Sequence, residues 1–368
     1  KGVNGDVISV PAPQVVELEG GRGVEISSEG NKAYAKIHGR PTTKKVGKRY
    51  IIEVDPVLHK KGDVDMSSGN IRFKGDVVVH GNVSEGMIVQ ATGNITVKGM
   101  TFSAQIAAQG DITVGRNITG SSLVAGGNIG FFRSLNKTLE TIHSDFVKII
   151  GTASMLSKSN EKLGNVKTGQ LIQLIIDSKY KQVPTLIAEM IKFSNQNAFI
   201  IPTVIMQFLD NVEKKLSGLN ILKIERMGEM EAILSEMENI RNIMKGMAAN
   251  KADIKFGYAV NSRIEASGDV KVEGRGCINS TIIAGGNVNV KGVFRGGEIR
   301  AGGDVVMNEA GSEMCARTLV SAGGDRKILI RKVHEGVRLK VGKRIADIRS
   351  VQNNVQASLD KDGMLLIT

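Results

Sequence analysis

Acidic and amide side chains recur directly after glycine, at a nearly fixed step, along two stretches of this 368-residue chain. A column of carboxylates at such a step could bind calcium, which prefers oxygen ligands. The alternative, which we favour, is a structural corner, since Asp and Asn side chains bond the backbone of their own turn. The calcium-binding nonapeptide G-G-x-G-x-D-x-U-x is also absent. The predicted corner ladder comprises Gly75, Gly93, Asn94, Gly110, Asp111, Gly127, Asn128, Gly268, Asp269, Gly286, Asn287, Gly303, Asp304, Gly324 and Asp325.

The two cysteines fall in phase with this series. Cys277, Phe294 and Cys315 each lie nine residues before one of its glycines, which predicts one inward-facing column on successive turns. The cysteines would then be two turns, about 9–10 Å, apart, whereas a disulfide needs Cα atoms within about 7 Å. We therefore expect both to be buried, unreactive small hydrophobic residues.

Catalytic chemistry has little support in the repeats. Enzymes built on β-helices need clustered carboxylates or a positioned base, but here the acids recur once per turn. The five histidines are scattered, and only His80 falls within a predicted turn. We predict no catalytic, cofactor-binding or metal-binding residue. A carbohydrate-active enzyme stays as the alternative.

A basic segment follows the last repeat. Residues 326–349 hold nine basic and two acidic residues, in a chain of net charge +12. Nucleic acid or an anionic surface could bind here, although no aromatic platform for bases accompanies the charge, so nucleic acid is not the partner we favour. The candidate interaction residues are Arg326, Lys327, Arg331, Lys332, Arg338, Lys340, Lys343 and Arg344.

The elements that position these residues follow from a finer period. Apolar residues recur every six positions from Ile71 through Val77 and Val83 to Val89 and Ile95. Three such steps make one turn of 17–18 residues. This predicts a parallel β-helix of triangular section, with glycine at corners where a positive φ is needed. Turns would stack by backbone hydrogen bonds, so stability is a nearest-neighbour sum.

A helical insertion interrupts the repeats. Residues 131–252 hold only six of the 44 glycines, and apolar residues at both ends follow heptad spacing typical of coiled coils. We expect an antiparallel helical hairpin at 131–252. Shorter helices are predicted at 170–178 and 185–193, broken by Pro184, with another after Pro202.

These patterns divide the chain into five segments. We predict an irregular β segment at 1–61 that caps the β-helix, the first half of the β-helix at 62–130, the insertion at 131–252, the second half at 253–325 and a basic β cap at 326–368. Two cysteines exclude a disulfide-built scaffold and favour a reducing compartment. No run of 18 apolar residues that could cross a membrane is present.

A family resemblance is carried by the residues before and within the first turns. Gly39-Arg40-Pro41, Val54-Asp55-Pro56-Val57, Gly62-Asp63-Val64-Asp65 and the run from Ser68 to Val77 are similar to the bacterial flagellar assembly protein A family, as is Val83-Ser84-Glu85-Gly86. The resemblance covers about 1–130 and 253–350. It implies a right-handed β-helix like that of bactofilins and of the septum inhibitor's C-terminal domain.

The resemblance also implies a function. The family brings no catalytic residues. We therefore expect a non-enzymatic cytoplasmic scaffold linked to flagellar assembly or its placement, with a location at the membrane periphery as the alternative. Its partners would be flagellar or polar assembly proteins, bound through the β-helix faces and the helical arm. We expect self-association to a dimer or small oligomer.

Overall fold

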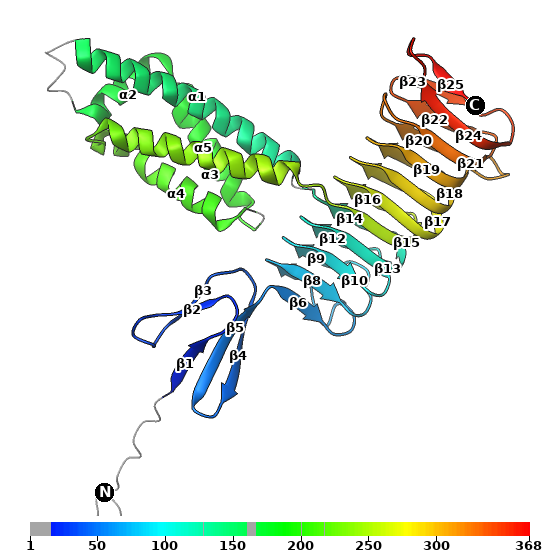
Figure 1. The fold of residues 1–368 in the computed structure, drawn as a ribbon, viewed down its shortest axis with the longest axis horizontal. Helices are drawn as coiled ribbons and strands as arrows, with labels where there is room; N and C mark the ends of the chain where they lie inside the picture. The colour runs from blue at the N-terminus through cyan, green and yellow to red at the C-terminus, as the bar shows by residue number, and fades with distance from the viewer. Residues whose placement is uncertain (1–15, 128, 160–166, 200, 217) are drawn as a thin grey trace, which may run out of the picture.

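The computed structural model describes residues 16–127, 129–159, 167–199, 201–216 and 218–368. These residues form a small N-terminal sheet, a long β-solenoid and a helical insertion (Figure 1). The insertion leaves the solenoid near the middle of its length, and the two bodies diverge from that junction. The chain is therefore mainly β with one helical interruption.

The N-terminal sheet is largely exposed. Its strands are β1 (Glu17–Gly20), β4 (Arg40–Val46) and β5 (Arg49–Asp55), in the order β1-β5-β4, beside the hairpin of β2 (Val24–Ile26) and β3 (Ala33–Ala35). Within the described residues, none of these strands pairs with the solenoid. A contact to the insertion exists, since His38 Nε2 lies 3.3 Å from Thr203 Oγ1.

The solenoid begins directly after this sheet. Its strands before the insertion are β6 (Val57–Lys60), β7 (Ile71–Phe73), β8 (Asp76–Val79), β9 (Ile88–Ala91), β10 (Ile95–Val97), β11 (Thr101–Phe102), β12 (Gln105–Ala108), β13 (Ile112–Thr119) and β14 (Ser122–Ala125). Those after it are β15 (Ile254–Val260), β16 (Arg263–Ala266), β17 (Val270–Ala284), β18 (Val288–Ala301), β19 (Val305–Ala310), β20 (Thr318–Ala322), β21 (Ile328–Val333) and β22 (Val337–Val341).

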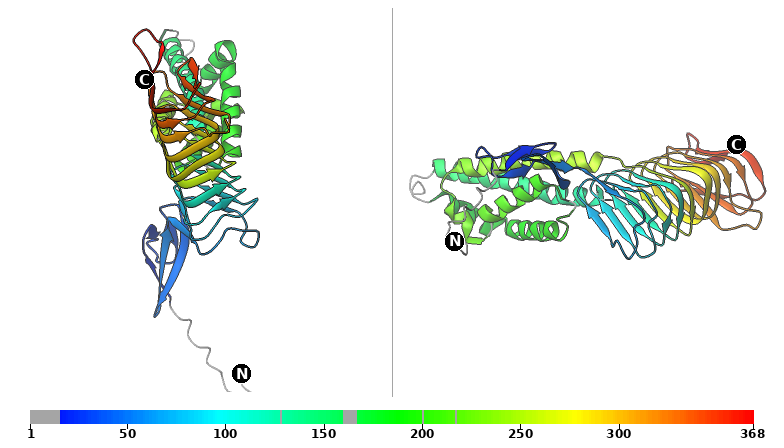
Figure 2. Two further views of the ribbon diagram at one scale, coloured as in Figure 1. Left: turned by 90° about the vertical axis from the view of Figure 1, so that its right-hand side faces the viewer. Right: turned by 90° about the horizontal axis from the view of Figure 1, so that it is seen from below.

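Each turn pairs in parallel with the next, and the parallel strands curl into one large sheet (Figure 2). Ile95 pairs with Val77 on one side and with Ile112 on the other, steps of 18 and 17 residues. The first turn after the insertion joins the last turn before it, because Ile112 pairs with Ile254. Inward residues at these positions are fully buried aliphatic side chains in a single core.

The far end of the solenoid is covered. The last parallel strands, β21 and β22, lie beyond Asp325 and continue the turns. Strands β23 (Arg344–Asp347), β24 (Gln352–Leu359) and β25 (Leu365–Ile367) are antiparallel, and Ile348, Val355 and Ala357 add their side chains to the solenoid core.

The insertion contains the two long helices of the predicted hairpin and the shorter helices predicted between them. It consists of α1 (Ile129–Ser159), α2 (Thr168–Lys179), α3 (Gln182–Gln196), α4 (Thr203–Leu216), the 3₁₀ helix η2 (Gly218–Lys223) and α5 (Met227–Ala249). Helices α1 and α5 lie side by side, as the heptad spacing indicates, but α2, α3, α4 and η2 pack into the same core. Five helices bury apolar faces that two could not. This core is separate from that of the solenoid.

Local sequence explains the helix boundaries. Positions at 3,4 spacing from Phe132 to Ala153 are buried along α1, whereas Leu156, the next in phase, is 37% exposed. Pro184 does not break α3, which begins two residues earlier, because the first turn of a helix tolerates proline. Before α5, the Glu229 carboxylate accepts a hydrogen bond from the Arg226 backbone N–H at 3.2 Å. Among the described helices, none combines the length and apolarity needed to cross a bilayer.

The prediction of one buried column with both cysteines is correct for Cys277 and wrong for Cys315. Cys277 pairs with Phe294, and both are fully buried, but Phe294 pairs next with Ala310. Cys315 is exposed. The step from Val305 to its partner Ile328 is 23 residues instead of 17 or 18, and Cys315 lies in the bend that accommodates the extra residues, at φ 51°.

Candidate interaction surfaces

A ladder of side chains ties successive turns together at one corner of the solenoid. Each Asp or Asn accepts a hydrogen bond from the backbone N–H at the equivalent position of the next turn. The Asp76 carboxylate accepts from Asn94 at 2.7 Å, and the Asn94 amide oxygen accepts from Asp111 at 2.8 Å. The series ends where the Lys327 N–H donates to Asp304 at 2.9 Å.

The ladder continues without a gap from the last turn before the insertion to the first turn after it. The Asp253 N–H donates to Asp111 at 2.8 Å, and the Asp269 N–H to Asp253 at 2.7 Å. Asp253 therefore occupies the place predicted for Asn128, which lies outside the described residues. Asp325 was also assigned wrongly: Lys327 takes its position, and Asp325 forms an ion pair with Arg326 at 3.3 Å.

The role of the ladder differs from the predicted one. The side chains bond the following turn rather than their own, so they act as clamps between turns. At Gly93, Gly110 and Gly286 the glycine is needed for space and not for a positive φ, because φ is not positive there, whereas Gly75, before Asp76, has φ 145°. A Cβ at Gly286 would overlap the Asp269 carboxylate. Among the described residues, no group of three or more His, Cys, Asp or Glu side chains could hold a metal ion.

A second ladder, of hydroxyl groups, was not predicted. Ser121 Oγ accepts from the Ala104 N–H at 3.2 Å, and Ser262 Oγ from Ser121 at 3.3 Å. Ser280 Oγ continues the series by accepting from Ser262 at 3.2 Å. Each hydroxyl also donates to the carbonyl two residues earlier, as Ser262 does to Val260 at 2.7 Å. The 18-residue step from Ser262 to Ser280 is the signal in the sequence.

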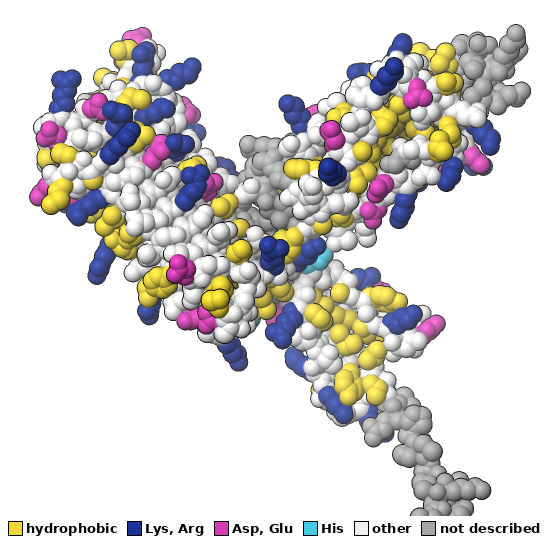
Figure 3. Space-filling model, turned by 180° about the vertical axis from the view of Figure 1, so that it is seen from behind, with side chains coloured by type: hydrophobic (Ala, Val, Ile, Leu, Met, Phe, Trp, Pro, Cys, Tyr) yellow, Lys and Arg dark blue, Asp and Glu magenta, His cyan; other side chains and the backbone are white. Residues whose placement is uncertain are grey.

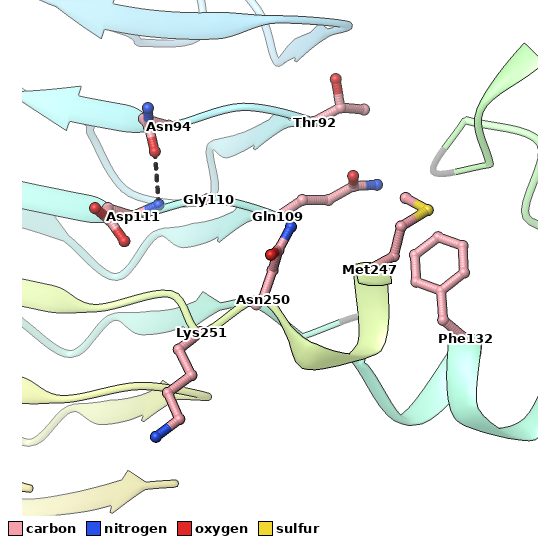
Figure 4. A pocket seen from close by; sticks show the side chains of 10 residues that line it. Thr92, Asn94, Gln109, Gly110, Asp111, Phe132, Met247, Asn250 and Lys251 are labelled. Carbon is pink, nitrogen blue, oxygen red and sulfur yellow. Dashed lines mark hydrogen bonds between the residues drawn. The ribbon is translucent and has the colours of Figure 1, made fainter. Parts of the chain in front are cut away.

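A cavity of about 350 Å³ separates the solenoid from the insertion (Figure 4). Thr92, Asn94 and Gln109 line it from the solenoid corner, and Phe132 and Met247 from α1 and α5. Because the two apolar cores do not merge across this cavity, the insertion is joined to the solenoid chiefly through its two connecting segments.

The eight predicted interaction residues lie at the covered end. Arg331 and Lys332 lie on β21, Arg338 and Lys340 on β22, and the others beside these strands or on β23. They are exposed or half-buried. Several are already engaged: Arg338 Nε donates to Asp347 at 2.7 Å, and Arg344 Nε to the Gly363 carbonyl at 3.1 Å.

Basic side chains are not confined to this end. Lys and Arg are spread over the visible face of the solenoid and outnumber Asp and Glu there (Figure 3). Three histidines also lie in the turns. His80 Nε2 lies 3.4 Å from His59 Nδ1, and partial desolvation, Lys98 and His59 lower the pKa of His80. The buried His334 contacts Glu309 Oε1 through Nε2 at 2.7 Å. These contacts join neighbouring turns of the solenoid.

The two cysteines are expected to differ sharply in thiol chemistry. Burial raises the pKa of Cys277 to about 12, so almost none of it is thiolate near neutral pH, whereas Cys315 is exposed. A disulfide-exchange reagent at pH 8 should modify one thiol rapidly in the native protein and the second only after unfolding. Cys315→Ser should abolish the rapid phase and Cys277→Ser should leave it. Two rapid native thiols would contradict the assignment.

Comparison with known proteins identifies the architecture. Residues 56–252 and 237–364 match the family model described as the Flagellar Assembly Protein A beta solenoid domain. No curated protein and no solved structure matches the chain. The matched ranges include the N-terminal half of the solenoid, the helical insertion and the turns that follow it. The chain therefore belongs to the Flagellar Assembly Protein A beta solenoid domain family.

Proposed function

We propose that this chain is a non-enzymatic cytoplasmic scaffold, which assembles proteins needed to build or place the bacterial flagellum. Its solenoid would be right-handed and triangular in section, with flat faces available to partners. The N-terminal sheet, the two solenoid halves, the insertion and the basic C-terminal strands would act as separate segments. Family membership carries the flagellar part of this proposal.

Two features support a scaffold rather than an enzyme. The repeated aspartates are engaged as acceptors for backbone N–H groups of neighbouring turns, so they are not free to act as paired acids and bases. The insertion and the solenoid have separate cores, so the chain can present two surfaces to different partners. We expect self-association to stop at a dimer or small oligomer, because β23–β25 cover one solenoid end.

The direct test is genetic. The gene would be deleted in the flagellated bacterium that carries it, and flagella per cell and their positions would be counted by electron microscopy. Loss or misplacement of flagella, restored by the full chain, supports the proposal. Normal flagella in the deletion strain would refute it.

Removing the insertion should leave the solenoid folded. The connecting segments already meet, since a Cβ at Gly126 would lie 3.1 Å from the Ala252 Cβ, and the ladder passes directly from Asp111 to Asp253. Replacing residues 129–250 by a short Gly/Ser linker should remove the helical circular-dichroism signal and keep a cooperative β-sheet transition. A variant without a cooperative transition would contradict the independence of the two cores. The folded variant then tests whether the insertion is needed for flagella.

A further inference from the structure

A groove of about 540 Å³ lies along another corner of the solenoid, away from the insertion. Its lining includes Gly115, Arg116, Gly257, Tyr258, Gly274 and Arg275, and we call it the glycine groove. No helical residue lines it. These residues come from β13, β15 and β17, which are consecutive along the stack.

Register shifts and glycines create the hollow. Pairing shifts between Val114 and Asn117, between Phe256 and Tyr258, and again between Val272 and Gly276, as in β-bulges. At these shifts the glycines lie directly on the backbone of the preceding turn. A Cβ at Gly115 would lie 2.6 Å from the Lys98 carbonyl oxygen, and one at Gly274 would lie 2.5 Å from that of Gly257. Part of the groove is therefore lined by bare backbone, beside the side chains of Arg116, Tyr258 and Arg275.

The rims carry unmatched positive charge. Arg116 and Arg275 are exposed, and in the described part of the chain no acidic side chain forms an ion pair with either. The neighbouring acid, Glu273, is already engaged, since Lys291 Nζ lies 2.7 Å from one carboxylate oxygen and Lys255 Nζ lies 3.8 Å from the other. The hydrogen bond from Lys291 lowers the pKa of Glu273. An anionic ligand would therefore find both arginines available.

The spacing of these groups indicates the shape of that ligand. Arg116 and Arg275 are two turns apart, about 9–10 Å along the stack, and half-buried Tyr258 lies on the turn between them. Residues three positions apart in a polyproline II segment lie on the same face and about 9 Å apart. The arrangement suits two carboxylates at positions i and i+3 of an extended segment, with an apolar residue between them. Single-stranded nucleic acid usually stacks successive bases on successive aromatic rings, whereas this lining offers the ring of Tyr258 alone among the described residues.

We propose that the glycine groove binds an extended acidic segment of a partner protein, with carboxylates on Arg116 and Arg275 and an apolar side chain against Tyr258. This inference rests on the proposed scaffold function and assigns one partner-binding surface to it. Arginine is suited to the contact because its guanidinium can donate two parallel hydrogen bonds to one carboxylate.

Fluorescence anisotropy with the purified full chain tests the proposal. The probe is a fluorescein-labelled peptide that repeats glutamate, leucine and proline, so that carboxylates recur at every third residue, compared with a labelled oligothymidine of similar charge. The test variant is Arg116→Glu/Arg275→Glu. The matched control, Arg317→Glu/Arg349→Glu, changes the net charge equally at exposed arginines outside the groove. Melting temperatures should show that both variants fold.

The proposal predicts that the peptide binds the unmodified chain and binds the test variant at least about tenfold more weakly, with little change in the control. Tyr258→Ser should weaken binding of the leucine peptide more than that of a peptide with serine in place of leucine. No binding, equal loss in the control, or tighter binding of oligothymidine would each overturn the proposal. If the test variant still restores flagella in the deletion strain, the groove assignment fails while the scaffold function stands.

Discussion

Replacing Phe294 by alanine is expected to lower the free energy of unfolding by about 3–5 kcal/mol, as large-to-small substitutions in packed cores do. Phe294 is fully buried, and its partners in the adjacent turns are Cys277 and Ala310. Both neighbours are small, and the backbone of each turn is held by its hydrogen bonds, so the cavity cannot close by collapse. Urea denaturation followed by circular dichroism gives the free-energy change.

Phe102 supplies the control. It also lies on a solenoid strand, but its side chain is 40% exposed, so Phe102→Ala should cost much less. A loss below about 1 kcal/mol for Phe294→Ala, far under the range for buried aromatic residues, would mean that the residue does not fill the core as described.

Gly276→Ala is expected to destabilise the solenoid by about 2–5 kcal/mol, the sum of a positive-φ penalty and a steric clash. Gly276 has φ 110°, and a Cβ there would overlap the backbone of Val293 in the next turn. That backbone cannot move away without breaking the pairing of β17 with β18. The melting temperature and urea midpoint should both fall.

Gly86 separates the two contributions. It too has a positive φ, 75°, but nothing lies within 4 Å of its potential Cβ. Gly86→Ala should therefore show the conformational penalty alone, about 1–2 kcal/mol. Equal losses for the two variants would show that the contact with Val293 contributes nothing.

The repeat architecture was predictable because its signals are periodic. Steps of 17 and 18 residues between inward aliphatic residues correspond to the observed pairing of Val77, Ile95 and Ile112. The insertion was visible as a glycine-poor segment, and its shorter helices were predicted, but the packing of all its helices into one core was not. Heptad spacing identifies a buried face without saying how many neighbours cover it.

The wrong predictions concern residues whose position in the stack of turns differs from the position that the sequence repeat assigns to them. Asp253 takes a ladder position without a preceding glycine, because pairing with Asp111 is set by the return of the chain from the insertion. Cys315 lies outside the core because the turn before Ile328 is longer than the others, and Ala310 instead of Cys315 pairs with Phe294. The glycine groove depends on register shifts, and these follow from pairing between turns rather than from any one segment.

The link from Asp111 to Asp253 also has a kinetic consequence. These residues are neighbours in the ladder although 142 positions separate them in the chain. Joining the two solenoid halves through an unstructured segment of that length would cost about 2 kcal/mol more loop-closure entropy than a 17-residue turn. If α1 and α5 pair first, their ends lie together and the effective loop becomes short. The order of synthesis favours this route, since the helices emerge before the second half of the solenoid. On that route the insertion would bring the next strand to the edge of a stack that is already formed and would speed the joining of the two solenoid halves.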